Sequence, residues 1–108
     1  MLISINDTII DTKQIHSISP IIKGQISKLP NNKIDYMETH HFEINFFKNI
    51  EPKPLYIRSP FIGYYKEPQD SSRIEKEHAQ NLIKISGFRD AIIKIWQENQ
   101  SEIPQFNF

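Results

Sequence analysis

The spacing of apolar residues changes near residue 70, and this change constrains the fold more than any other feature. Before it, apolar residues alternate with polar ones, as at Phe42, Ile44 and Phe46. After it, they recur every three to four residues, at Ile74, His78, Leu82, Ile85, Phe88, Ile92 and Trp96. Alternation is typical of a half-buried strand, and the longer period is typical of one face of a helix. The sequence therefore predicts an α+β fold, with an antiparallel sheet or partial barrel of about five or six strands packed by a long C-terminal helix.

The chain length of 108 residues predicts a single domain, strand-rich over 1–69 and helical over 70–100, with a tail at 101–108. Ser72 and Glu75 have the spacing of a capping box, which predicts that the helix begins there. An unbroken helix over 72–99 would measure about 42 Å, whereas a compact domain of this size is only about 34 Å across. We therefore expect either a bend or break near Gly87, which we favour, or a helix end that projects onto a partner.

Turn residues predict how the strands pair. Asn6-Asp7 favours a tight first hairpin, Pro30-Asn31-Asn32 a second turn, and 48–53 a third. The even-numbered positions between Ile34 and Phe46 are mostly apolar, which predicts one long strand with its even face buried. The expected strands are 2–5, 8–10, part of 15–22, 34–46, 55–58 and, as a final strand or an aromatic loop, 61–65.

Composition excludes several classes of function. Thirteen basic and thirteen acidic residues cancel, so no overall field attracts nucleic acid or an anionic membrane. The absence of cysteine excludes disulfides, thiolate nucleophiles and cysteine-ligated metals. The first residues lack a signal-peptide pattern and no apolar run approaches a membrane span, so we expect a cytoplasmic protein. The abundance of Ile, Lys and Asn favours a bacterial or phage origin.

A strand-rich first part followed by a C-terminal helix that ends near Trp96 resembles the pleckstrin-homology-like domains. The resemblance covers the order and type of the elements. It implies a binding or scaffolding module, because such folds rarely perform chemistry. The first hairpin turn, Asn6-Asp7-Thr8, has no Lys or Arg, so the phosphoinositide binding of that family is not carried over.

A metal-dependent enzyme is the sharpest catalytic hypothesis. Glu38 and His40 would share one face of the long strand, and His78 lies on the apolar face of the helix, so the three could form a two-histidine, one-carboxylate site. The simpler interpretation is a strand that leaves the core and a histidine that packs inside it. No cofactor is predicted: the three glycines are too widely spaced for a phosphate-binding loop, and no Gly-x-Ser-x-Gly occurs.

Nucleic-acid binding is a second alternative, carried by basic residues of the helical region. Acidic residues are mixed among them, and such a mixture is typical of a solvated face with pairs such as Asp90 and Lys94. The candidate contacts are Arg73, Lys76, Lys84, Arg89 and Lys94.

The leading hypothesis is a non-enzymatic module that binds another protein or a second copy of itself, such as a small inhibitor, immunity-type or scaffold protein. Aromatic residues and arginine are the types that anchor protein interfaces. The alternating apolar residues of the tail would either add to a sheet edge or cover the core of the domain itself. The candidate interface residues are Tyr56, Arg58, Tyr64, Tyr65, Phe106 and Phe108.

Overall fold

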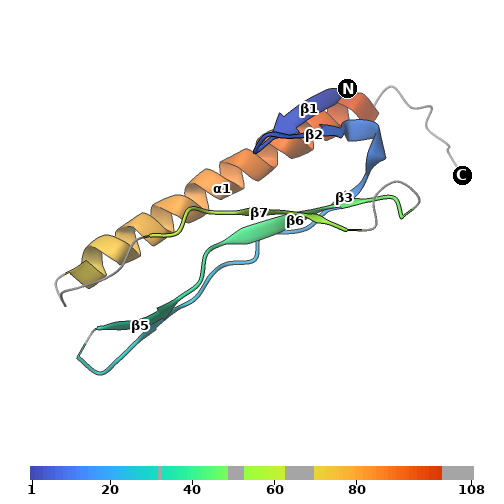
Figure 1. Ribbon diagram of the computed structural model, residues 1–108. Coiled ribbons are helices and arrows are strands. Elements are labelled where there is room, and N and C mark those ends of the chain that lie inside the picture. The colour runs from blue at the N-terminus through green and yellow to red at the C-terminus, as the bar shows by residue number, and fades with distance from the viewer. Residues whose placement is uncertain (32, 49–52, 63–69, 101–108) are drawn as a thin grey trace, which may run out of the picture.

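The computed structural model describes residues 1–31, 33–48, 53–62 and 70–100. It confirms the α+β class: short antiparallel strands form three small sheets, and one long helix lies along them without any closed barrel in the described chain (Figure 1). The strands are β1 (Leu2–Ile5), β2 (Thr8–Asp11), β3 (Ile15–Ile18), β4 (Ile26–Lys28), β5 (Ile34–Met37), β6 (His41–Phe46) and β7 (Leu55–Arg58). A 3-10 turn, η1 (Thr12–Gln14), precedes β3, and the helix is α1 (Asp70–Gln100).

The first hairpin forms as predicted. β1 and β2 pair antiparallel, with Ile5 opposite Thr8. Asn6 and Asp7 have φ values of 48° and 65°, the left-handed conformation that a tight two-residue hairpin turn requires and that Asn and Asp tolerate.

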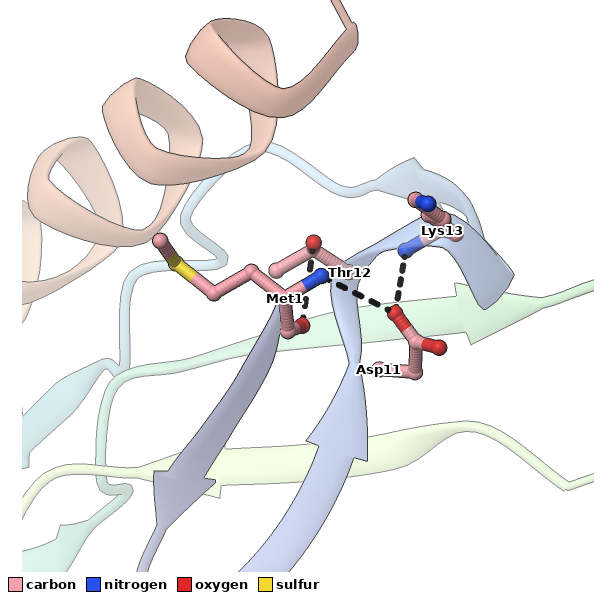
Figure 2. A network of polar contacts seen from close by, with 4 residues as sticks. All are labelled: Met1, Asp11, Thr12 and Lys13. Atoms are coloured by element: carbon pink, nitrogen blue, oxygen red, sulfur yellow. Dashed lines mark hydrogen bonds and ion pairs between the residues drawn. The ribbon is translucent and has the colours of Figure 1, made fainter.

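A network of polar contacts closes the corner between β2 and η1 (Figure 2). The Asp11 carboxylate accepts from the Lys13 amide at 3.1 Å and lies 3.4 Å from the N-terminal amine. The Lys13 hydrogen bond, joined by the positive N-terminus, holds the pKa of Asp11 below its usual value. Thr12 donates to the Met1 carbonyl through both its amide and its hydroxyl, at 2.9 and 3.2 Å. The hairpin is therefore fixed at its open end.

The second sheet is β3-β6-β7, and it contains the predicted hairpin over 42–58. The predicted long strand over 34–46 is wrong: the structure breaks it into β5 and β6. In β5 the half-buried residues are Ile34 and Met37, which do not alternate, whereas full burial falls on the even positions from His40 to Ile44. A regular buried face therefore begins only at His40. The β4–β5 hairpin continues beyond this break, around the turn that includes Pro30 and Asn31.

The core lies between the inner face of the sheet, the first hairpin and one side of α1. Ile85 and Ile92 of α1 close over the sheet, and Trp96 packs half-buried against the same cluster. The prediction that Phe88 lies in the buried stripe of the helix is wrong, because this side chain is 40% exposed. The strand residues of this core are Ile5, Ile10, Ile15, Phe42, Ile44 and Ile57.

The helix is unbroken, so the predicted break near Gly87 is wrong. Gly87 is exposed, and a Cβ built there would meet no atom within 4 Å. Its 31 residues span about 46 Å at 1.5 Å per residue. The predicted helix start at Ser72 is also wrong, because α1 begins at Asp70 and Ser72 lies inside it.

The long helix fits because the strands are spread along it. The radius of gyration is 17.9 Å, against about 13 Å for a compact chain of this length, and the molecule measures 58 × 25 × 24 Å. In Figure 1 the first hairpin lies near the C-terminal end of α1, and the arm that carries β5 extends toward the other end. Lys28 of β4 forms an ion pair with Glu75 near the start of α1.

Candidate functional site

The outer face of the three-stranded sheet carries exposed aromatic and cationic side chains. His41 lies opposite Arg58, and Glu43 lies opposite Tyr56. Tyr56 is 49% exposed. The Arg58 guanidinium lies 5.9 Å from the centroid of the Tyr56 ring, and the His41 ring lies 6.3 Å from it. We call Tyr56, Arg58 and His41 the β7 surface. It contains two of the predicted interface residues and adds His41.

Backbone hydrogen bonds fix which way each residue of β6 faces. The amide and carbonyl of His41 bond to Ile22, at 3.0 and 2.7 Å, and the Glu43 carbonyl accepts from Ser19 at 2.9 Å. These partners lie on the β3 side of the sheet. Because successive residues of an antiparallel strand direct their backbone groups to opposite sides, the even-numbered residues of β6 face β7.

The same alternation fixes β7. The Ser59 amide donates to the His40 carbonyl at 2.8 Å, so Ser59 and, two residues earlier, Ile57 face β6. The N–H and C=O groups of Tyr56 and Arg58 therefore point away from the sheet. Since β7 ends the order β3-β6-β7, they form a free strand edge within the described chain.

A groove runs between β7 and α1, which we call the β7–α1 groove. Its floor is apolar, formed by Ile57 of β7 and Ile85 and Phe88 of α1, and Arg58 and Lys84 also line it. This explains the exposure of Phe88: its side chain faces a groove beside the free strand edge. A separate groove lies beside Leu55, with Ile9 and Ile10 of β2 among its lining residues.

His40 forms a buried polar junction at the break between β5 and β6. Its Nδ1 accepts from the Gly24 amide at 2.9 Å, and its Nε2 donates to the His78 carbonyl at 2.9 Å. Its own amide donates to the Ser59 hydroxyl at 2.9 Å. His78 in turn donates from Nε2 to the Glu38 carbonyl at 3.0 Å, with the two imidazole centroids 4.1 Å apart. The junction ties four chain segments together, those that contain Gly24, residues 38–40, Ser59 and His78.

Burial favours the neutral form of His40. The residue is only 2% exposed, and this desolvation lowers the pKa of His40, although the hydrogen bond to the His78 backbone acts in the opposite direction. A second proton would have to sit on Nδ1, where the Gly24 amide already donates.

The junction also corrects the predicted metal site. The structure does bring His40 and His78 together, but both His40 ring nitrogens are occupied, and Glu38 contributes its backbone carbonyl while its side chain is exposed. Across residues 1–31, 33–48, 53–62 and 70–100, no group of three or more His, Asp or Glu is placed to hold a metal ion.

The basic residues suggested for nucleic acid have different environments. Arg89 is half-buried and donates from Nε to the Ser19 carbonyl at 2.6 Å, so it ties α1 to the segment after β3. Arg73 pairs with Glu77 at 3.2 Å. The exposed cations Lys76, Lys84 and Lys94 complete the set.

Four of the predicted interface residues, Tyr64, Tyr65, Phe106 and Phe108, lie outside the described residues. Of the expected strand or loop over 61–65, only Phe61 and Ile62 are described, and neither is in a strand.

Two residues of the junction were missed. Gly24 lies so close to the segment between β5 and β6 that a Cβ would approach the Glu38 carbonyl oxygen at 2.1 Å. Ser59 closes the other side. The only sequence signal was that Gly24 is one of three glycines in the chain.

No helix in the described ranges is long and apolar enough to cross a membrane. A scan against protein-family models, a search of curated proteins and a search of solved structures each found no match to this chain.

Proposed function

We propose that this chain is a non-enzymatic protein-interaction module and that the β7 surface is its binding face. The observation that carries the proposal is the half-exposed Tyr56 with the Arg58 guanidinium beside its ring, on a strand at the edge of the sheet. Tyr and Arg are over-represented among the residues that dominate binding energy. A half-exposed aromatic ring with a cation beside it offers a partner both apolar area and a positive charge.

The use of His40 also favours binding over catalysis. His40 and His78 were the strongest candidates for acid–base or metal chemistry. However, both ring nitrogens of His40 form hydrogen bonds with backbone groups. A general base needs a nitrogen within reach of the proton that it removes. The junction instead positions β6 and α1, and so supports the strand that carries His41.

We further propose that the module is a small inhibitor, immunity-type or scaffold protein of bacterial or phage origin, which fits a chain of 108 residues rich in Ile, Lys and Asn. A pleckstrin-homology-like relationship would agree with the same role. Both rest on composition and on the order of the elements.

Site-specific photocrosslinking in cells of the source organism tests the proposal. A benzophenone amino acid replaces Tyr56 in one variant and Lys76, exposed on α1, in the control. We expect an adduct of discrete mass at position 56 that is lost when Arg58→Glu is added, and only background at position 76. Equal labelling at the two positions, or an adduct that ignores Arg58→Glu, would refute the β7 surface as the binding face.

A further inference from the structure

We infer that the partner contributes an extended segment, with apolar and acidic residues in alternation, which adds as a strand to the free edge of β7. This inference rests on the proposed function and specifies the chemistry of the partner. It joins three properties of one place in the fold: a backbone edge with no partner among the described residues, an apolar floor beside it and a positive rim.

The backbone supplies the docking template. Tyr56 and Arg58 direct their N–H and C=O groups away from β6, and neither has a backbone partner among the described residues. Unpaired strand edges pair readily with an added strand, whose main-chain hydrogen bonds supply affinity without demanding a sequence. An incoming strand beside β7 would bond to both residues, because they are two positions apart.

The floor of the β7–α1 groove supplies selectivity for apolar side chains. Every second side chain of an added strand would point toward the core side, where Ile57, Ile85 and Phe88 line the groove. Phe88 is 40% exposed and would be covered by such a side chain. The separate groove beside Leu55, with Ile9 and Ile10 of β2 among its lining residues, would take an apolar side chain further along the same strand.

Charge selects the remaining positions. Arg58 and Lys84 line the β7–α1 groove. The described residues that line this groove and the groove beside Leu55 include no Asp or Glu. The side chains between the apolar ones would point to the outer face, where the Arg58 guanidinium lies beside Tyr56, so acidic residues there would be attracted and basic residues repelled.

Peptide binding tests the inference. The probe is an acetylated octapeptide that alternates Val and Glu, and the control replaces each Glu with Lys. Amide NMR of the full chain should show that the Tyr56 and Arg58 amides exchange quickly with solvent in the free protein, whereas the Ile57 amide is protected. The Val–Glu peptide should slow exchange at Tyr56 and Arg58 and shift the signals of Phe88 and Lys84. The Val–Lys peptide should bind at least about tenfold more weakly.

A matched pair of substitutions separates the strand edge from the side chain. Tyr56→Pro removes the outward N–H while leaving the bonds of Ile57 to β6, since proline is tolerated where an edge N–H faces solvent. Tyr56→Ala keeps that N–H. We expect Tyr56→Pro to weaken Val–Glu binding at least about tenfold and Tyr56→Ala to weaken it only about two- to threefold. Protection of the Ile57 amide shows that both variants keep the sheet.

Charge reversal provides an independent variant should Tyr56→Pro disturb the strand. With Arg58→Glu and Lys84→Glu together, the preference should invert, so that the Val–Lys peptide binds more tightly than the Val–Glu peptide. Equal binding of both peptides to both proteins would refute the charge argument.

Three further outcomes would overturn strand addition. Tyr56 and Arg58 amides already protected in the free monomer would show that the chain fills its own edge. Protection that rises with protein concentration would assign the edge to a second copy. No exchange or shift response at millimolar peptide would exclude the partner chemistry. If the position-56 adduct persists in that last case, only the strand inference fails; if it is absent too, the proposed function fails.

Discussion

His40 and His78 join the strands to helix α1 through two hydrogen bonds, each from an imidazole ring to a backbone carbonyl. Nε2 of His40 donates to the His78 carbonyl at 2.9 Å, and Nε2 of His78 donates to the Glu38 carbonyl at 3.0 Å. Two residues 38 positions apart in sequence thus fix how the segment between β5 and β6 is placed along helix α1.

The first prediction concerns stability and pH. Because burial lowers the pKa of His40 in the folded state, the unfolded chain binds more protons at this residue than the folded chain does when the pH falls below about 6.5. The free energy of unfolding should therefore be highest above the unfolded pKa of about 6.5 and fall as the pH drops below it, at no more than about 1.4 kcal/mol per pH unit for this one group. Urea denaturation at several pH values measures the slope.

The matched variants for this slope are His40→Gln and His16→Gln. Glutamine can still donate to the His78 carbonyl but does not titrate. His40→Gln should flatten the fall in stability below pH 6.5, whereas substituting the exposed His16 should leave it intact. An unchanged slope in His40→Gln would show that another group controls acid stability.

The second prediction sets two glycines against each other. Gly24→Ala should destabilise the protein by roughly 1–3 kcal/mol, because its Cβ would collide with backbone atoms of Glu38 and Thr39 that cannot rotate away. Gly87→Ala should stabilise it by up to about 1 kcal/mol, since the site is helical, exposed and open. Thermal unfolding of both variants checks the two signs. Stabilisation by Gly24→Ala would contradict the close approach at the junction.

The third prediction tests which side of α1 is buried. Ile85 is 4% exposed in the core, and Ile83, two residues earlier, is 73% exposed. Ile85→Ala should cost about 2–5 kcal/mol of unfolding free energy, and Ile83→Ala should stay within about 0.5 kcal/mol of the unmodified protein. Chemical denaturation compares them. Similar losses in the two variants would mean that α1 is rotated from the orientation described.

The fourth prediction concerns Arg89. Its Nε donates to the Ser19 carbonyl from a half-buried position, so Arg89→Ala should cost about 1–3 kcal/mol. The exposed Lys94→Ala, which removes an equal charge from the same helix, should change stability by no more than about 0.5 kcal/mol. Calorimetry on the two variants compares a cation that bonds to the backbone, Arg89, with an exposed cation, Lys94. Equal stability of the two would show that the Ser19 contact contributes little.

Local sequence signals predicted the elements whose determinants are local. Asn6-Asp7 specified the first hairpin because few residues accept two successive positive φ values. The alternation of Phe42 and Ile44 specified a strand with one buried face, and the period of Ile74, Ile85 and Ile92 specified the buried side of α1. In each case a few neighbouring residues were sufficient.

The remaining features depend on contacts between distant residues. Gly87 does not break α1, because a cost of about 1 kcal/mol is small beside the burial of Ile85 and Ile92 on either side of it. The break between β5 and β6 follows from Gly24 and His78, far away in sequence, which hold His40 inward. Phe88 shares the helical period of the buried residues, but it lies beyond the last strand of the sheet, and periodicity does not report where a sheet ends.

The length of α1 has a consequence for synthesis of the chain. All described strands precede residue 59, whereas Ile85 and Ile92, which cover them, come later. At about 5–20 residues per second, a ribosome needs roughly two to seven seconds to add the residues between Arg58 and Ile92. During that interval the apolar face of the newly synthesised sheet is not yet covered by α1. A translational pause in this region should therefore promote aggregation.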